Sequence, residues 1–158
     1  MLRIGKLTDY ATVILATLAT DRSRLLNAGT LAERTHIASP TVSKLLKQLQ
    51  RAGLVTSARG LRGGYRLSRP ADEITAAQIL DALEGPLALT TCASAAHQCD
   101  LESTCRVGGT WQRLSLAIHR SLCEVTLADL AGLAAVPVRF EAFDARLRAS
   151  LHGSPVKT

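Results

Sequence analysis

The chain has 158 residues, of which 47% are hydrophobic and 3% aromatic, so it is long enough to bury a core and that core must be aliphatic. No stretch approaches the roughly 18 uninterrupted apolar residues that a membrane helix needs, and the first residues lack the features of a secretory signal. We therefore expect a cytoplasmic protein with no membrane partner, whose four cysteines are reduced.

Charge divides the chain into two halves. Residues 1–70 hold 12 Lys and Arg against 3 Asp and Glu, a net charge of +9, whereas residues 71–158 hold 7 against 10, a net charge of −3. A basic first half joined to an acidic second half indicates a module that binds a polyanion, attached to a part with another task. A solvated surface with uneven charge is the alternative that charge leaves open.

Three segments in the first half predict helices. Apolar residues at helical spacing predict the first helix over about residues 8–20. Thr30 and Glu33 form a possible capping box, which predicts the start of a short second helix. Ser39 as a cap with Pro40 at the first helical position predicts the third helix, which has an apolar stripe on one side and polar residues on the other.

A short β-hairpin is predicted after the third helix. Gly53 supplies the left-handed residue that ends the helix, and residues 54–58 and 65–68 have the composition of two short strands. The loop between them, residues 59–64, is basic and rich in glycine. Helices joined by a tight turn and followed by a basic hairpin are typical of a winged helix-turn-helix domain, assigned to residues 1–70. The predicted fold is mainly α with a small β-hairpin wing.

The third helix and the hairpin loop carry the candidate DNA-binding residues. Such a helix can enter the major groove with its polar face, and loop arginines suit the narrow minor groove, where negative potential concentrates. The alternative is a solvated helix face and an ordinary turn, but the helix starts, the helix end and the basic hairpin agree in favouring double-stranded DNA. The candidates are Ser39, Thr41, Ser43, Lys44, Gln48 and Arg51 on the helix and Arg59 and Arg62 on the loop.

The second half begins with a connecting helix and continues into a cysteine-rich segment. Thr75 and Gln78 form a capping box for a helix that stops at Gly85. This helix and its linker are assigned to residues 71–91. Residues 92–109 hold three cysteines among small and polar residues, a composition too irregular for a helix or a strand, and are predicted to form a loop.

A long amphipathic helix is predicted from Thr110 to about Glu124. Its large apolar residues are spaced 3, 4, 4 and 3 apart, a heptad-like seam suited to a partner helix, so we expect a homodimer. Thr126 is a cap for a short further helix, which makes residues 110–135 the dimerisation part and residues 136–158 a C-terminal tail. The seam residues are Trp111, Leu114, Ile118, Leu122 and Val125.

The cysteines predict a metal or redox site rather than an enzyme. Cys92, Cys99 and Cys105 fall within 14 residues, and three thiolates from one loop can hold an iron–sulfur cluster if a fourth ligand comes from elsewhere. Zinc, which usually uses closer cysteine pairs, and thiols without metal remain alternatives. Cys123 lies in the long helix and is expected to be a packed core thiol. No catalytic triad, paired carboxylates or phosphate loop is present, so no enzymatic activity is expected.

Four segments occur together in a specific combination: residues 6–11 (KLTDYA), 39–44 (SPTVSK), 59–65 (RGLRGGY) and the three-cysteine loop before Trp111. This combination resembles the IscR/NsrR family of bacterial regulators over about residues 1–135. Residues 79–86 (ILDALEGP) and 99–105 (CDLESTC) are most similar to regulators of the SUF iron–sulfur assembly system.

The resemblance implies a dimer crossed by the long helix and a 2Fe–2S or 4Fe–4S cluster on Cys92, Cys99 and Cys105. It also implies transcriptional control, such as repression, of iron–sulfur assembly genes. IscR-type members place a ligand histidine three residues after the last cysteine, where this chain has Gly108. Asp9 matches the position from which NsrR-type members supply a carboxylate across the dimer, although a helix cap at Asp9 is an equal alternative.

Two other functions remain open at this point. The same DNA-binding fold can carry a metal-free thiol switch, with Cys99 or Cys105 as the reactive thiol, or a nitric-oxide sensor. A protein of another class, an iron–sulfur carrier or assembly scaffold, would use its basic face to bind an acidic partner. The helix from Ser39 to Arg51 and the basic wing favour the regulator, because a carrier does not need them.

Overall fold

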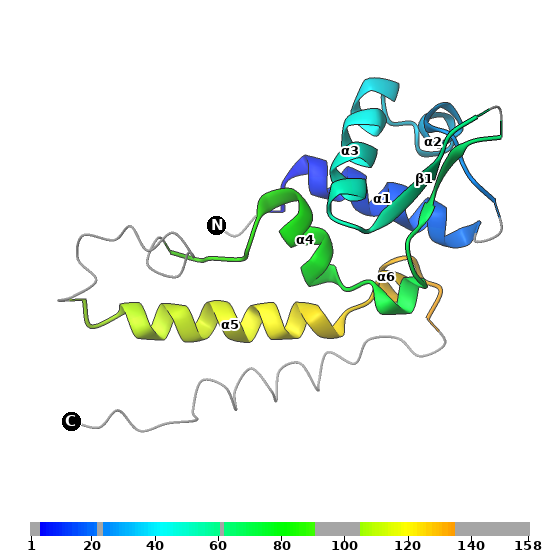
Figure 1. Ribbon diagram of the computed structural model, residues 1–158. Helices are drawn as coiled ribbons and strands as arrows, with labels where there is room; N and C mark the ends of the chain where they lie inside the picture. The colour runs from blue at the N-terminus through cyan, green and yellow to red at the C-terminus, as the bar shows by residue number, and fades with distance from the viewer. Residues whose placement is uncertain (1–3, 22–23, 61, 91–104, 135–158) are drawn as a thin grey trace.

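The computed structural model describes residues 4–21, 24–60, 62–90 and 105–134. In these ranges the chain forms a winged-helix unit and a long helix that projects from it (Figure 1). The mainly α fold with a small β-hairpin is confirmed. The elements are α1 (Lys6–Thr20), α2 (Ala28–Thr35), α3 (Ser39–Arg51), β1 (Val55–Ala58), β2 (Gly64–Leu67), the 3-10 turn η1 (Ala71–Glu73), α4 (Ala76–Glu84), α5 (Gly108–Glu124) and α6 (Leu127–Leu130).

The start of α2 differs from the prediction because another residue caps it. The side chain of Asn27 accepts a hydrogen bond of 2.8 Å from the backbone N–H of Thr30. Thr30 therefore lies inside the helix, and the predicted capping box of Thr30 and Glu33 is wrong. The predicted box of Thr75 with Gln78 does form at α4, and Thr126, predicted as a cap, forms a capping box with Asp129 at α6.

The start of α1 is capped from another helix. The Oε1 atom of Glu84, the last residue of α4, accepts hydrogen bonds from the backbone N–H of Gly5 (2.7 Å) and from the Thr8 hydroxyl (2.6 Å). These bonds hold the pKa of Glu84 below its ordinary value of 4.5, and the bond from Thr8 has the larger effect. Asp9 lies inside the helix and is exposed, so a capping role for Asp9 is wrong.

The core is aliphatic, as the composition predicts, and its largest fully buried side chains are Ile, Leu and Val. The apolar stripe of α3 is completely buried. The same core continues past residue 70 through Ile74 and Ile79 to Leu127 on α6, so the domain boundary expected at residue 70 is not a break in packing. The four residues of the α3 stripe are Val42, Leu45, Leu46 and Leu49.

The wing is an antiparallel hairpin joined to the segment before α2. β1 and β2 pair from Val55 with Leu67 to Ala58 with Gly64. Tyr65 also exchanges two backbone hydrogen bonds with Leu26, of 2.8 and 3.0 Å. A Cβ atom at Gly64 would lie 2.8 Å from the Leu26 backbone, so only glycine permits this close approach.

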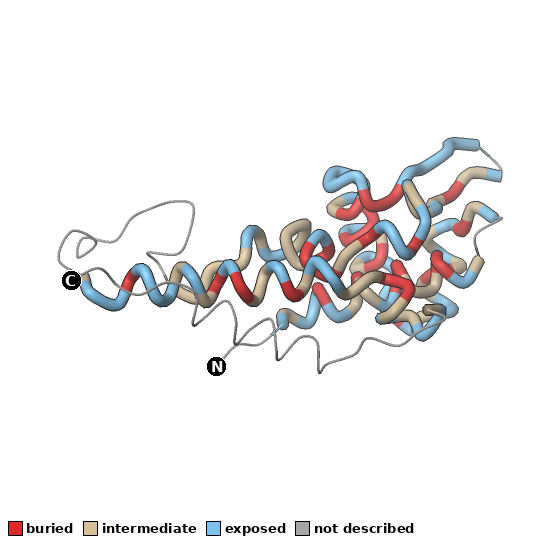
Figure 2. The backbone as a smooth tube through the Cα atoms, turned by 90° about the horizontal axis from the view of Figure 1, so that it is seen from below, coloured by how far each residue is buried: buried red, intermediate tan, exposed pale blue. Residues whose placement is uncertain are grey.

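The long helix α5 begins at Gly108, two residues earlier than predicted, because the expected loop ends sooner. It packs along α4, and its buried residues are small. Figure 2 shows buried and exposed residues alternating along the projecting helix. Trp111 of the predicted seam is 42% exposed. Cys123 is exposed, so its interpretation as a packed core thiol is wrong. The buried residues of α5 are Gly108, Ser115, Ala117 and Ser121.

Past α5 the chain returns to the winged-helix unit. The backbone N–H of Leu127 donates to the carbonyl of Ile74 (2.7 Å), and the N–H of Ala76 donates to the carbonyl of Val125 (2.8 Å). These two bonds fix the C-terminal end of α5 to the start of α4. Residues 92–104 of the predicted cysteine loop and the tail (136–158) lie outside the described residues.

Candidate nucleic-acid interface and cysteine region

Helix α3 presents a basic face on the side opposite its buried stripe. Lys44, Lys47 and Arg51 are exposed, and their spacing of three and four residues places them on one side of the helix. Ser39 is also exposed at the first turn, whereas Thr41 and Ser43 are half-buried on the two flanks. Lys47 adds a cation that the predicted set did not include. The face suits the polyanionic DNA backbone.

Gln48 differs from its predicted place on the exposed face. Its side chain is half-buried, and its Oε1 atom is enclosed without a hydrogen-bond partner among the described residues. An enclosed amide oxygen is less available to a base edge than the cations around it. We therefore expect Lys44 and Arg51 to contribute more than Gln48 to DNA contacts.

The hairpin loop holds two exposed arginines, Arg59 and Arg62. The turn between them is tight, because the backbone N–H of Gly63 donates to the carbonyl of Gly60 (2.8 Å) and a Cβ atom at Gly63 would lie 2.4 Å from the carbonyl oxygen of Ala58. Gly60 has a φ of 110°, which side chains rarely permit. The glycines therefore shape the loop that carries the arginines.

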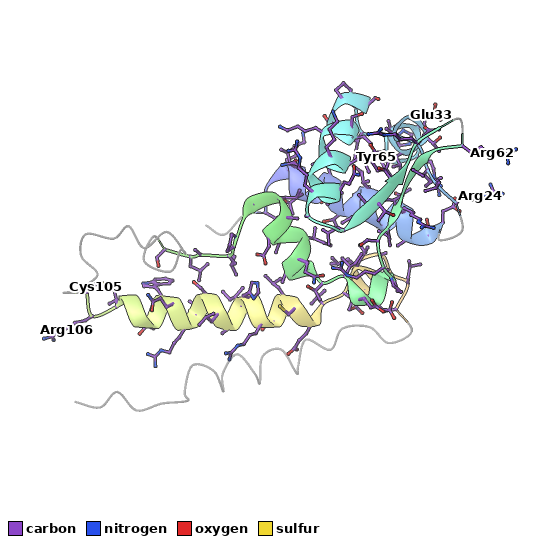
Figure 3. The ribbon with its side chains drawn as sticks, in the orientation of Figure 1. Arg24, Glu33, Arg62, Tyr65, Cys105 and Arg106 are labelled. Atoms are coloured by element: carbon purple, nitrogen blue, oxygen red, sulfur yellow. The ribbon has the colours of Figure 1, made fainter. Side chains whose placement is uncertain are left out.

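Arg24 extends this basic end of the molecule, and the sequence reasoning missed it. Figure 3 shows Arg24 and Arg62 at the same end of the protein, both directed away from the helices. Arg24 is exposed and lies two residues before Leu26, whose backbone pairs with the wing at Tyr65. No local sequence pattern identifies Arg24 as part of this surface, because only the pairing of Leu26 with Tyr65 places it beside the hairpin.

The cysteine region lies at the opposite end. Cys105 is partly exposed, three residues before α5, and Figure 3 places it far from Arg62. Cys92 and Cys99 lie outside the described residues. Within the described ranges, no three His, Cys, Asp or Glu side chains are close enough to hold a metal ion. Among the described residues, Asp9 and Cys105 therefore belong to no such group.

The fold and this surface define a winged-helix transcription regulator: three helices and a hairpin form the reading unit, and its recognition helix and wing are basic. No described helix is sufficiently long and apolar to traverse a bilayer. The chain belongs to the Rrf2 family, because residues 4–132 match the family model, which is described as an iron-dependent transcriptional regulator. The resemblance to IscR/NsrR regulators is thereby confirmed, and the chain is a regulator rather than an enzyme.

Individual relatives agree with this assignment. A Neisseria meningitidis protein named as an HTH-type transcriptional regulator is 39% identical over 100 residues, which cover 63% of this chain and 67% of the relative. CymR, the global cysteine regulator of B. subtilis, has a TM-score of 0.65 and 29% identity, covering 85% of this chain and 99% of CymR. IscR of T. potens has a TM-score of 0.61 and 24% identity, covering 89% and 96%, and shows the shared fold.

Proposed function

We propose that the protein is a homodimeric regulator whose affinity for its operator depends on an iron–sulfur cluster. The ligands would be Cys92, Cys99 and Cys105, with Asp9 of the second copy as the fourth. The observation that carries the proposal is the position of Cys105 directly before α5, a helix whose other end is bonded to the winged-helix unit at Ile74. The target genes would be those for iron–sulfur cluster assembly through the SUF system.

The donor set fits a cluster that can be lost. Three thiolates are strong iron ligands, whereas a carboxylate is a harder and weaker one. When bound, such a cluster supplies redox chemistry and reactivity toward oxygen or nitric oxide. In this proposal, the bound cluster would order the cysteine segment. The ordered segment would set where α5 begins and therefore how far apart the two winged-helix units of the dimer lie.

DNA recognition would use both basic elements of each unit. Helix α3 would enter the major groove with Lys44, Lys47 and Arg51, and the wing would place Arg59 and Arg62 along the minor groove. A two-fold dimer would match two half-sites about one helical turn apart. The exposed cations of the unit support this arrangement, because each phosphate contact releases counterions.

The cluster is tested by absorption spectra of anaerobically purified protein. We expect visible thiolate-to-iron bands in the wild type and their loss in Cys105→Ser. Cys123→Ser is the matched control and should keep the bands, because Cys123 lies at the far end of α5. Bands that survive Cys105→Ser, or that are missing from the wild type, would contradict the cluster assignment.

Operator binding is tested by selection from a random duplex library. We expect an enriched motif with two-fold symmetry, and a plot of log affinity against log salt with a slope of about −0.9 per phosphate contact. Lys44→Ala should make that slope less steep by about 0.9, the share of one phosphate contact. Arg113→Ala on α5 should leave the slope unchanged. Failure to enrich any motif with holo or apo protein would favour an iron–sulfur carrier.

A metal-free thiol switch is the second candidate, favoured by the likeness to CymR and by the partial exposure of Cys105. It predicts an enriched operator motif without visible absorption bands. In that case Cys105→Ser would abolish the response of DNA binding to oxidants while leaving reduced protein able to bind. The absorption spectra of the wild type and Cys105→Ser therefore distinguish the cluster from the metal-free thiol switch before any DNA experiment.

A further inference from the structure

Three polar side chains form a connected row across the contact between α4 and α5. The Sγ atom of Cys123 lies 3.7 Å from Nδ1 of His119, and Nε2 of the same ring lies 3.2 Å from Oδ2 of Asp81. His119 and Cys123 are one turn apart on α5, so they share a face, and Asp81 comes from α4. None of the three belongs to the proposed cluster or to the DNA-binding face.

The order of the row fixes the role of each group. A carboxylate can only accept, so the contact with Asp81 requires the proton on Nε2, and in the neutral imidazole the lone pair of Nδ1 is then directed at the thiol. The other oxygen of Asp81, Oδ1, is enclosed and has no hydrogen-bond partner among the described residues. Among the described residues, the Asp81 carboxylate therefore makes its polar contact through Oδ2 with His119. It orients the ring toward Cys123.

We propose that Cys123 is a modification site that reacts with low-molecular-weight disulfides. His119 would act as the base and Asp81 as the residue that positions it, the arrangement that activates a nucleophile next to an oriented imidazole. The thiol is exposed, so such a molecule can reach it. A metal site is not favoured, because the described residues hold no group of three ligands at metal-binding distances.

The reaction is a thiol–disulfide exchange. The Cys123 thiol gives its proton to Nδ1 of His119, and the sulfur attacks one sulfur of the disulfide. The S–S bond of the reagent breaks as a new S–S bond forms to Cys123. The leaving thiolate takes the proton from the imidazolium, so Cys123 is oxidised and half of the reagent is reduced to a thiol.

The test measures how fast oxidised glutathione modifies Cys123 in the full-length protein. Trypsin separates Cys123 from the other three cysteines, because residues 121–139 form one peptide and the other three lie together on a peptide that ends at Arg106. Leu116→Cys provides an internal reference, because Leu116 is exposed on the same helix. The residue four positions before it, which corresponds to His119 for Cys123, is a glutamine and cannot act as a base. We expect Cys123 to react about tenfold faster than the introduced thiol, a modest effect for general-base assistance.

Removal of His119 or Asp81 distinguishes activation from simple exposure. His119→Ala should bring the rate of Cys123 to that of the reference thiol, and Asp81→Asn should lower it in part, because the ring loses its positioning carboxylate. Because Cys123 is already exposed, unfolding of α5 would also separate it from His119 and slow the reaction. Rates are therefore compared only among variants whose circular dichroism matches that of the wild type. Equal rates for Cys123 and the reference, or a rate unchanged by His119→Ala, would overturn the proposal. Neither outcome depends on the cluster.

Discussion

The winged-helix unit and helix α5 differ in how completely one chain covers their apolar residues. The whole apolar stripe of α3 is buried, whereas Trp111, at the start of the predicted seam on α5, is 42% exposed. Ile118 and Leu122 line a cavity of about 270 Å³ beside α4. The reading unit is thus complete within one chain, while α5 has apolar surface left for another, which supports the proposed dimer.

The largest expected effect breaks the proposed dimer. Leu114→Glu combined with Ile118→Glu places two charges in the predicted seam and should convert the protein to monomers, as measured by light scattering. The control is Leu116→Glu. Leu116 is two residues from Ile118 and therefore roughly 200° around the helix, so its change should leave the dimer intact. A dimer that survives the double change but not the control would move the interface to the other side of α5.

The next effect compares core with surface directly. Leu46→Ala empties a fully buried position in α3 and should lower the free energy of unfolding by about 3 kcal/mol. Leu116→Ala removes the same atoms from an exposed position and should change it by less than about 0.5 kcal/mol. Urea denaturation followed by circular dichroism measures both. Similar losses for the two variants would show that Leu116 is covered in the assembled protein.

A smaller effect is expected where the two regions join. Thr75 caps α4 and pairs through its backbone with Thr126 beyond α5. Thr75→Ala removes the hydroxyl that accepts from the Gln78 N–H and should cost about 1 kcal/mol. Thr75→Ser keeps a capping hydroxyl and should restore most of that loss in the same denaturation experiment. Equal losses for the alanine and serine variants would exclude capping as the cause.

The smallest effect concerns Glu84 and depends on pH. Because its pKa is lower in the folded protein, the Glu84 carboxylate stabilises the fold above the ordinary value of 4.5, and this contribution is lost as the pH falls through the folded-state pKa. Glu84→Gln should therefore lower the melting temperature near neutral pH and make little difference in acid. Thr8→Val, which removes the principal hydrogen bond, should reduce the same pH dependence. A difference between wild type and Glu84→Gln that is independent of pH would contradict this assignment.

The sequence predicts best where the signal is local. The end of α3 at Gly53, the stop of α4 at Gly85 and the capping box at Thr75 each depend on residues within one turn, and the structure has all three. The predicted box at Thr30 failed because Asn27, three residues earlier, provides an equally good cap.

The parts of the site that escaped prediction depend on distant contacts. Glu84 caps α1 by accepting a bond from Gly5, 79 positions earlier in the chain, and Arg24 joins the wing only through backbone pairing of Leu26. The environment of Cys123 depends on how α4 packs against α5. No periodicity or motif contains this information, because it arises only when the elements pack together.

The return of the chain from α5 to the core has a mechanical consequence. The bond from Leu127 to Ile74 holds one end of α5, while Cys105 lies just beyond the other. A helix of 17 residues is about 25 Å long at 1.5 Å per residue. A displacement of about 1 Å at the cysteine end thus corresponds to a rotation of roughly 2° about the anchored end. Helix α5 would therefore transmit a displacement near Cys105 as a rotation about its anchored C-terminal end, next to the DNA-binding unit.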